Sequence, residues 1–108
     1  MSVSDEQIAH ALELFEGVGP MTTRKMFGGL AIYAEGKVFA VLMSDGVLKL
    51  KGAGPMVNVL ESEGWERWTY SREGSDKVTK MPYWTLPDEL LDDPEQASDW
   101  ARRALAEL

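Results

Sequence analysis

The stretch at residues 30–51, LAIYAEGKVFAVLMSDGVLKLK, decides the fold of this chain, because three runs of strand-forming residues follow one another across two short turns. The runs are residues 30–34, 37–44 and 47–51, and the turns between them are Glu35-Gly36 and Asp45-Gly46. Asp-Gly between two apolar runs is a strong signal for a β-hairpin. The stretch therefore predicts three antiparallel strands within a β-meander over residues 22–51.

The pattern of apolar residues along these runs predicts which strands are buried. Residues 38–43 are apolar at every position, which is expected of a central strand covered on both faces of its sheet. Residues 47–51 alternate instead. Leu48 and Leu50 are therefore expected in the core, while Lys49 and Lys51 project from the opposite face.

Three other segments carry helix signals. Ser4 and Gln7 fit a capping box, and apolar residues then recur at helical spacing until Gly17 ends the helix. Pro55 is placed as the first residue of a short helix that ends near Gly64. The segment at 93–96 opens a final helix whose apolar stripe must dock on another element. This stripe consists of Ala97, Trp100, Ala101, Ala104, Leu105 and Leu108.

A second hairpin is predicted from residues 65–72 and 77–85, which are rich in aromatic and β-forming side chains around a turn at 73–76. Pro82 inside the later strand indicates an edge position or a bulge. The aromatic residues of this hairpin suggest base stacking, but their alternating spacing also fits cross-strand core packing, which we expect. They are Trp65, Trp68, Tyr70, Tyr83 and Trp84.

These elements follow one another in the order α-β-β-β-α-β-β-α. That order predicts an α+β fold in which helices pack on an antiparallel five-stranded sheet. The length of 108 residues and the hydrophobic content of 44% are typical of one globular domain. We therefore interpret residues 1–108 as a single domain.

Composition argues against several kinds of active site. With no Cys and with His10 as its single His, the chain lacks a disulfide framework, a Cys/His metal cluster and a thiol nucleophile. His10 falls on the polar side of the first predicted helix, so we expect an exposed surface residue. The acid pairs at 88–89 and 92–93 are expected to cap helix starts, and Gly28-Gly29 to form a bend or bulge. We expect no enzyme activity, no metal and no cofactor.

The formal net charge of −7 argues against nucleic-acid binding as the default function. Residues 85–108 hold seven acids and two arginines, so most of this charge is C-terminal and a local basic patch can exist elsewhere. No segment has the form of a signal peptide, and the longest apolar stretch is too short to cross a bilayer. We expect a cytoplasmic protein with no membrane partner. The candidate residues of the basic patch are Arg24, Lys25, Lys49 and Lys51.

The chain contains several short motifs that are specific in combination. They are TRKMFGG at 23–29, IYAEGKVFA at 32–40, LKLK at 48–51, MPYWTLP at 81–87, LLDDP at 90–94 and Trp100-Ala101. Together they resemble the N-terminal domain of the TfoX/Sxy family of bacterial competence regulators over nearly the whole chain. The resemblance implies a sheet flanked by helices in a two-layer, secretion-chaperone-like fold, and it implies no catalytic residues. Full-length members also carry a C-terminal helical domain and act with the cyclic-AMP receptor protein, whereas this sequence ends at Leu108.

Three functions stand as hypotheses. The first is a non-enzymatic module that binds a still unidentified protein partner, with a role in transcriptional regulation of competence genes. The second is direct nucleic-acid binding through Arg24, Lys25, Lys49 and Lys51, which salt would weaken. The third is a small-ligand site or an enzyme of unknown type, with aromatic walls around a pocket. The oligomeric state is not decided by the sequence. A homodimer is plausible, because proteins with the fold that the resemblance implies often form dimers.

Overall fold

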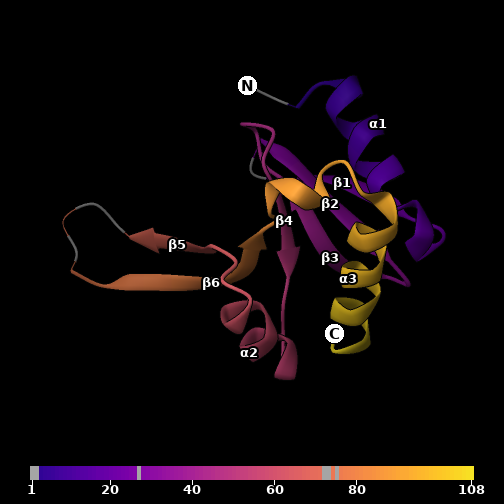
Figure 1. The fold of residues 1–108 in the computed structure, drawn as a ribbon. Helices are drawn as coiled ribbons and strands as arrows, with labels where there is room; N and C mark the ends of the chain where they lie inside the picture. The colour runs from indigo at the N-terminus through magenta and orange to yellow at the C-terminus, as the bar shows by residue number, and fades with distance from the viewer. Residues whose placement is uncertain (1–2, 27, 72–73, 75) are drawn as a thin grey trace.

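The computed structural model describes residues 3–26, 28–71, 74 and 76–108, and Figure 1 shows how its elements are arranged. The helical elements are α1 (Asp5–Leu14), α2 (Pro55–Ser62) and α3 (Pro94–Ala106), with short 3-10 turns η1 (Glu16–Val18) and η2 (Asp88–Leu90). The strands are β1 (Thr22–Met26), β2 (Gly29–Ala34), β3 (Lys37–Leu42), β4 (Leu48–Lys51), β5 (Arg67–Ser71) and β6 (Val78–Thr85). The predicted α+β class is confirmed. No helix among the described residues is long and apolar enough to span a membrane.

All six strands form one antiparallel sheet in the order β1-β2-β3-β4-β6-β5. The predicted number of five strands was wrong, because β1 pairs with β2 as an additional edge strand. Its sequence, TTRKM, is exposed at the first four positions, so it lacks the apolar alternation from which strands are predicted. The bend predicted at Gly28-Gly29 is confirmed, since Gly28 has a φ of 75° in the turn before β2.

The predicted helix starts are confirmed. Ser4 and Gln7 make both hydrogen bonds of a capping box on α1, and Pro55 begins α2. Asp93 caps α3 by accepting a hydrogen bond of 3.1 Å from the backbone N–H of Gln96. The Ser4 and Asp93 side chains satisfy backbone donors that have no partner within the helix, whereas Pro55 has no N–H group that needs one.

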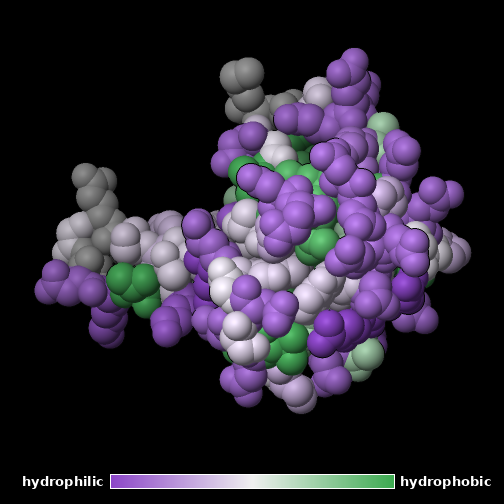
Figure 2. Space-filling model, in the orientation of Figure 1, coloured by the Kyte–Doolittle hydropathy of each residue, from purple (hydrophilic) through white to green (hydrophobic). Residues whose placement is uncertain are grey.

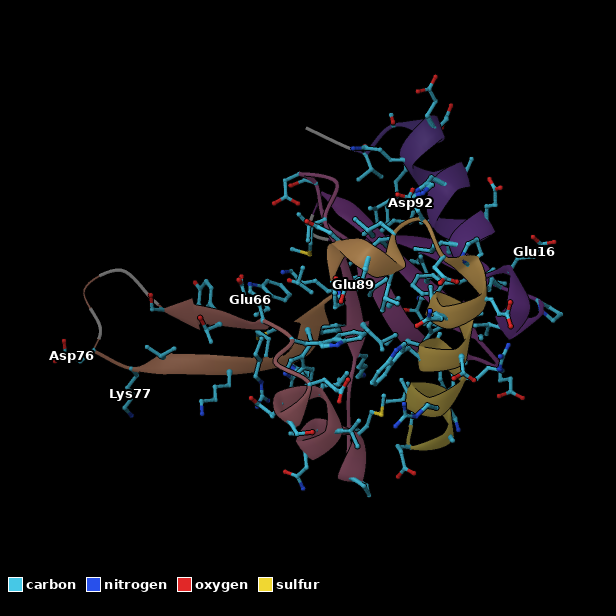
Figure 3. All side chains as sticks on the ribbon, in the orientation of Figure 1. Glu16, Glu66, Asp76, Lys77, Glu89 and Asp92 are labelled. Atoms are coloured by element: carbon cyan, nitrogen blue, oxygen red, sulfur yellow. The ribbon has the colours of Figure 1, made fainter. Side chains whose placement is uncertain are left out.

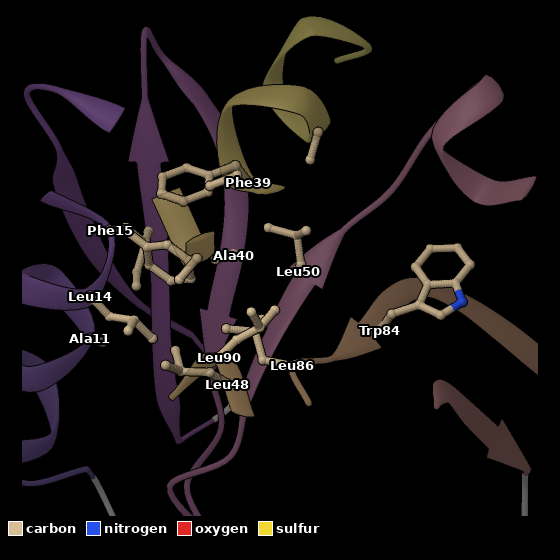
Figure 4. Close-up of a cluster of buried hydrophobic side chains, with 14 of the residues drawn as sticks. Ala11, Leu14, Phe15, Phe39, Ala40, Leu48, Leu50, Trp84, Leu86 and Leu90 are labelled. Atoms are coloured by element: carbon tan, nitrogen blue, oxygen red, sulfur yellow. The ribbon is translucent and has the colours of Figure 1, made fainter. Parts of the chain in front are cut away.

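The helices form one layer on one face of the sheet, and we call it the helical layer. It buries the main hydrophobic core, where side chains of α1, the sheet strands and the segment before α3 meet (Figure 4). A register shift in the β2–β3 ladder turns both Phe39 and Ala40 toward this core. The Phe39 ring meets that of Phe15 edge-on, with centroids 5.3 Å apart. The predicted apolar stripe of α3 docks here through Ala97, Ala101 and Ala104, all buried.

Strands β5 and β6 extend from the body as an arm (Figures 1 and 2). Pro82 lies where the β5–β6 register shifts: Arg67 and Thr69 pair with Trp84 and Lys80, so three residues of β6 face one of β5. The predicted bulge is therefore confirmed. No helix of the described residues packs on the outer part of the arm, and Tyr70 is 56% exposed. The expectation that Tyr70 packs in a core was wrong for this reason.

The other face of the sheet carries a second apolar cluster that is built from sheet residues alone. Its buried members are Ala31, Val41 and Tyr83. We expected helices or other layers on both faces of β3, but every helical residue packed against a core in the described chain belongs to the main core. We call this helix-free side of the sheet the open face. Its residues are Arg24, Met26, Ala31, Tyr33, Val38, Val41, Met43, Lys49, Lys51, Trp68, Met81 and Tyr83.

Candidate interaction surface

The open face is organised around one cross-strand row of residues. Arg24 on β1 pairs with Ala31 on β2, Ala31 pairs with Val41 on β3, and Val41 pairs with Lys49 on β4. The register therefore places two small buried side chains between two cations. Lys51 follows Lys49 on the same face, because side chains two apart in a strand point the same way.

Aromatic rings hold the two cations of this row. The guanidinium carbon of Arg24 lies 5.9 Å from the centroid of the Tyr33 ring. The Lys49 Nζ lies 5.9 Å from the Trp68 ring and donates a hydrogen bond of 2.9 Å to the Thr85 hydroxyl. Cations over aromatic faces gain electrostatic stabilisation from the ring quadrupole. Both charges are thus held at defined positions beside the apolar centre of the open face.

Tyr83 completes the apolar part of the open face beside β4. Its ring packs on that of Trp68, with centroids 5.9 Å apart. Burial raises the pKa of the Tyr83 phenol above its ordinary value of 10.0, and the nearby phenol of Tyr33 raises the pKa further. The hydroxyl therefore stays neutral at physiological pH.

The four predicted patch residues do not all meet. Arg24, Lys49 and Lys51 lie on the open face, as the alternation of β4 predicted for the two lysines. Lys25 pairs with Leu30, whose side chain is in the main core, and so lies on the helical side. There Lys25 lines a small pocket that Asp5 at the start of α1 also lines.

Charge is divided between the two layers of the molecule. Among the described residues, seven of the Lys and Arg residues lie in strands, whereas none of the Asp and Glu residues does. The described acids lie in helices and connecting segments, as Glu16, Glu66, Glu89 and Asp92 show in Figure 3. Hydrophilic residues accordingly cover α1 and α3 in Figure 2. The strand cations are Arg24, Lys25, Lys37, Lys49, Lys51, Arg67 and Lys80.

The aromatic residues of the second hairpin are distributed over both faces of the sheet. Trp65 and Trp84 are buried in the main core, and Trp65 packs against Trp100 of α3 with ring centroids 4.9 Å apart. Trp68 and Tyr83 lie on the open face. Tyr70 is two residues from Trp68 on the same side of the arm. Core packing is therefore confirmed for Trp65 and Trp84.

His10 is exposed, as predicted, and its Nε2 lies 3.2 Å from the carbonyl oxygen of Leu91. Among the described residues, no group of three or more His, Asp or Glu side chains is placed to hold a metal ion. The residues that sequence reasoning missed are Met26, Met43 and Met81, which border the open face half-buried. One signal in the sequence could have indicated them: β3 is apolar on both of its faces, which predicts a second apolar cluster on the side of the sheet away from the helices.

Comparison with known proteins identifies one family. The family model described as the TfoX N-terminal domain matches residues 13–108, which is almost the whole chain. The match includes all six strands and so the entire open face. No curated protein matches this chain.

Proposed function

This chain belongs to the TfoX N-terminal domain family, and from that premise we propose that it is a non-enzymatic regulatory module that acts through protein contacts. Its role is the transcriptional control of genes for DNA uptake, in the bacterial cytoplasm. The open face is the interface with the partner. Two observations support this proposal. One is the family membership, and the other is the open face, where apolar and cationic side chains of the described sheet have no helix above them.

The composition of the open face supports the proposal, because it differs from that of a sheet face that is exposed to solvent. A sheet with one solvated face normally alternates apolar with polar residues. Here both alternating sets of β2 and β3 are apolar apart from Lys37 at the start of β3, and their open-face members include Tyr33, Val38 and Val41. Contiguous apolar surface bordered by polar residues marks interaction sites on soluble proteins.

A cellular experiment tests this function. We expect an Arg24→Glu/Lys51→Glu double variant to lower transcripts of DNA-uptake genes and transformation to the level of a deletion strain. The matched control is Lys37→Glu/Lys80→Glu, which changes the net charge equally at two exposed strand positions outside the open face. Both variants must accumulate to wild-type amounts. Wild-type transcript levels in the open-face variant would refute the proposal.

Nucleic-acid binding through the same face is the second candidate function. The observation in its favour is the segregation of cations into the strands, next to Trp68 and Tyr33. It predicts that short single-stranded oligonucleotides bind at low salt, with an affinity that falls steeply as salt rises and is lost in the Arg24→Glu/Lys51→Glu variant. Against it, the Arg24 and Lys49 cations already lie over the Tyr33 and Trp68 rings on which bases would stack.

A further inference from the structure

We propose that the open face binds an amphipathic α-helix of a partner protein, with Asp or Glu residues along both borders of the apolar stripe of that helix. The inference rests on the proposed function, from which it takes the open face as the interface. It adds the secondary structure and the charge pattern of the partner.

Two small side chains, those of Ala31 and Val41, lie at the centre of the open face. Ala31 is fully buried and Val41 is 3% exposed, although no helix of the described chain lies over them. Larger side chains rise on either side along the strands, with Tyr33 toward one end of β2 and Met43 beyond the end of β3. Small residues between large ones let a helix approach a sheet closely, and methionine side chains adapt to the partner that covers them.

The spacing of the cations fits the width of a helix. Arg24 and Lys49 lie at the two ends of one row that crosses β1, β2, β3 and β4. Three inter-strand steps separate them, which is about 14 Å. An α-helix with its side chains is about 10–12 Å across. A helix placed over β2 and β3 therefore has one cation at each flank, within reach of carboxylates on both borders of its apolar stripe.

The charge of the open face favours an acidic helix over a second copy of this chain and over a nucleic acid. The strand residues of the open face carry positive charge only, because no Asp or Glu lies in any of the six strands. Two copies of this chain that paired through their open faces would therefore bring like charges together, which disfavours that dimer. A nucleic acid would have to displace Arg24 and Lys49 from the aromatic faces on which bases stack. Carboxylates can meet both cations where they are.

A displayed library of helices tests the proposal. Each member has the same Leu/Ala stripe on a helical scaffold, and the two border rows are varied among Glu, Gln and Lys. Selection on the purified wild-type chain is expected to enrich Glu on both borders. Selection on the Arg24→Glu variant is expected to retain Glu on one border and to replace it with Lys on the other, because Lys49 and Lys51 remain. Lys37→Glu, outside the open face, is the control and is expected to give the wild-type pattern.

The outcomes separate this inference from the proposed function. Failure to enrich any helix, enrichment without a charge preference, or a preference that Arg24→Glu leaves unchanged would each overturn the inference. Binding of a short oligothymidylate in competition with the selected helices would overturn it in favour of nucleic acid. Selected helices with Glu on both borders, together with normal DNA-uptake transcripts in the open-face variant, would support the helix site and refute the regulatory role.

Discussion

The hydroxyl of Ser98 on α3 accepts a hydrogen bond of 3.0 Å from the backbone N–H of Gly17 and donates one of 3.1 Å to the carbonyl oxygen of Leu14. Ser98 is 2% exposed and is the one buried polar residue of the described core. A single side chain thus satisfies backbone groups at the end of α1 and joins that end to α3. Its neighbour Gly17 has no room for a Cβ, which would lie 2.8 Å from the Cβ of Ser98.

Ser98→Ala should lower the free energy of unfolding by about 1–3 kcal/mol, because it leaves the buried carbonyl of Leu14 and the part-buried N–H of Gly17 without their partner. Urea denaturation monitored by circular dichroism measures this loss. Asn58→Ala, at an exposed position of α2, is the control and should change stability by no more than about 0.5 kcal/mol. Equal stabilities for the two variants would show that the Ser98 bonds contribute nothing net.

Arg67 of β5 makes three contacts, two with β6 of the same arm and one with α2 of the body. Its guanidinium carbon lies 4.4 Å from the centroid of the Trp84 ring, and its Nε donates a hydrogen bond of 2.8 Å to the carbonyl oxygen of Met81. The third contact is an ion pair of 3.4 Å with the half-exposed carboxylate of Glu61. We predict that Arg67→Met costs about 1–3 kcal/mol of unfolding free energy.

Glu61→Gln separates these contributions, because it removes the ion pair and leaves the other two contacts of Arg67. An exposed ion pair contributes little, so the expected cost is below about 1 kcal/mol. Thermal unfolding of both variants in low and high salt provides the measurement. A larger loss from Glu61→Gln than from Arg67→Met would contradict the expectation that the contacts of Arg67 with Trp84 and Met81 within the arm contribute more than its ion pair with α2.

Local signals allowed much of the fold to be predicted. The capping box at Ser4 and the helix start at Pro55 depend only on neighbouring residues, and so were readable without the tertiary structure. Edge strand β1 was not, because its polar sequence becomes a strand only through pairing with β2. Tyr70 was misplaced for a similar reason: its alternation is that of a core strand, but the arm carries no layer above it.

The candidate site was predicted in part. Alternation in β4 placed Lys49 and Lys51 together on one face, as the structure has them. The position of Arg24 depends on its pairing with Ala31, which links segments across a turn and sets the side of every β1 residue. The same register sends Lys25 to the helical side. We placed Arg24 and Lys25 in one patch because they are adjacent in the sequence. Successive side chains of a strand point to opposite faces of the sheet, so the two residues are separated in the structure.

Gly29, at the start of β2, lies against the backbone at the end of β3. A Cβ on Gly29 would collide with the carbonyl oxygen of Leu42, which is a backbone atom and cannot rotate away. Gly29→Ala is expected to cost about 3 kcal/mol, at the upper end of the effect of overpacking. Gly36→Ala is the comparison: there a Cβ meets open space, but φ is 76°, so only backbone strain of about 1–2 kcal/mol is expected. Chemical denaturation of the two variants should rank Gly29→Ala as the less stable, and the reverse order would contradict this account.

Tyr83 makes stability depend on pH in the alkaline range. Burial, and then the phenol of Tyr33, raise the pKa of Tyr83 in the folded chain above the value of 10.0 that applies when it is exposed. Above pH 10 the unfolded chain therefore loses this proton while the folded chain keeps it, so stability is full below pH 10 and falls as pH rises toward the folded pKa. The slope from this one group is at most about 1.4 kcal/mol per pH unit.

Tyr83→Phe removes the group that titrates, and its unfolding free energy should decline less steeply than that of the wild-type chain above pH 10. Tyr33→Phe should reduce the steepness only in part, because desolvation is the larger cause of the raised pKa and the Tyr33 phenol the smaller. Tyr70→Phe, at an exposed position of the arm, is the control and should retain the wild-type slope. Urea denaturation at closely spaced pH values between neutral and alkaline conditions gives the slopes of the three variants and of the wild-type chain. Parallel curves for Tyr83→Phe and the wild-type chain would mean that the Tyr83 phenol ionises alike in the folded and unfolded chain, contrary to its burial between Trp68 and β4.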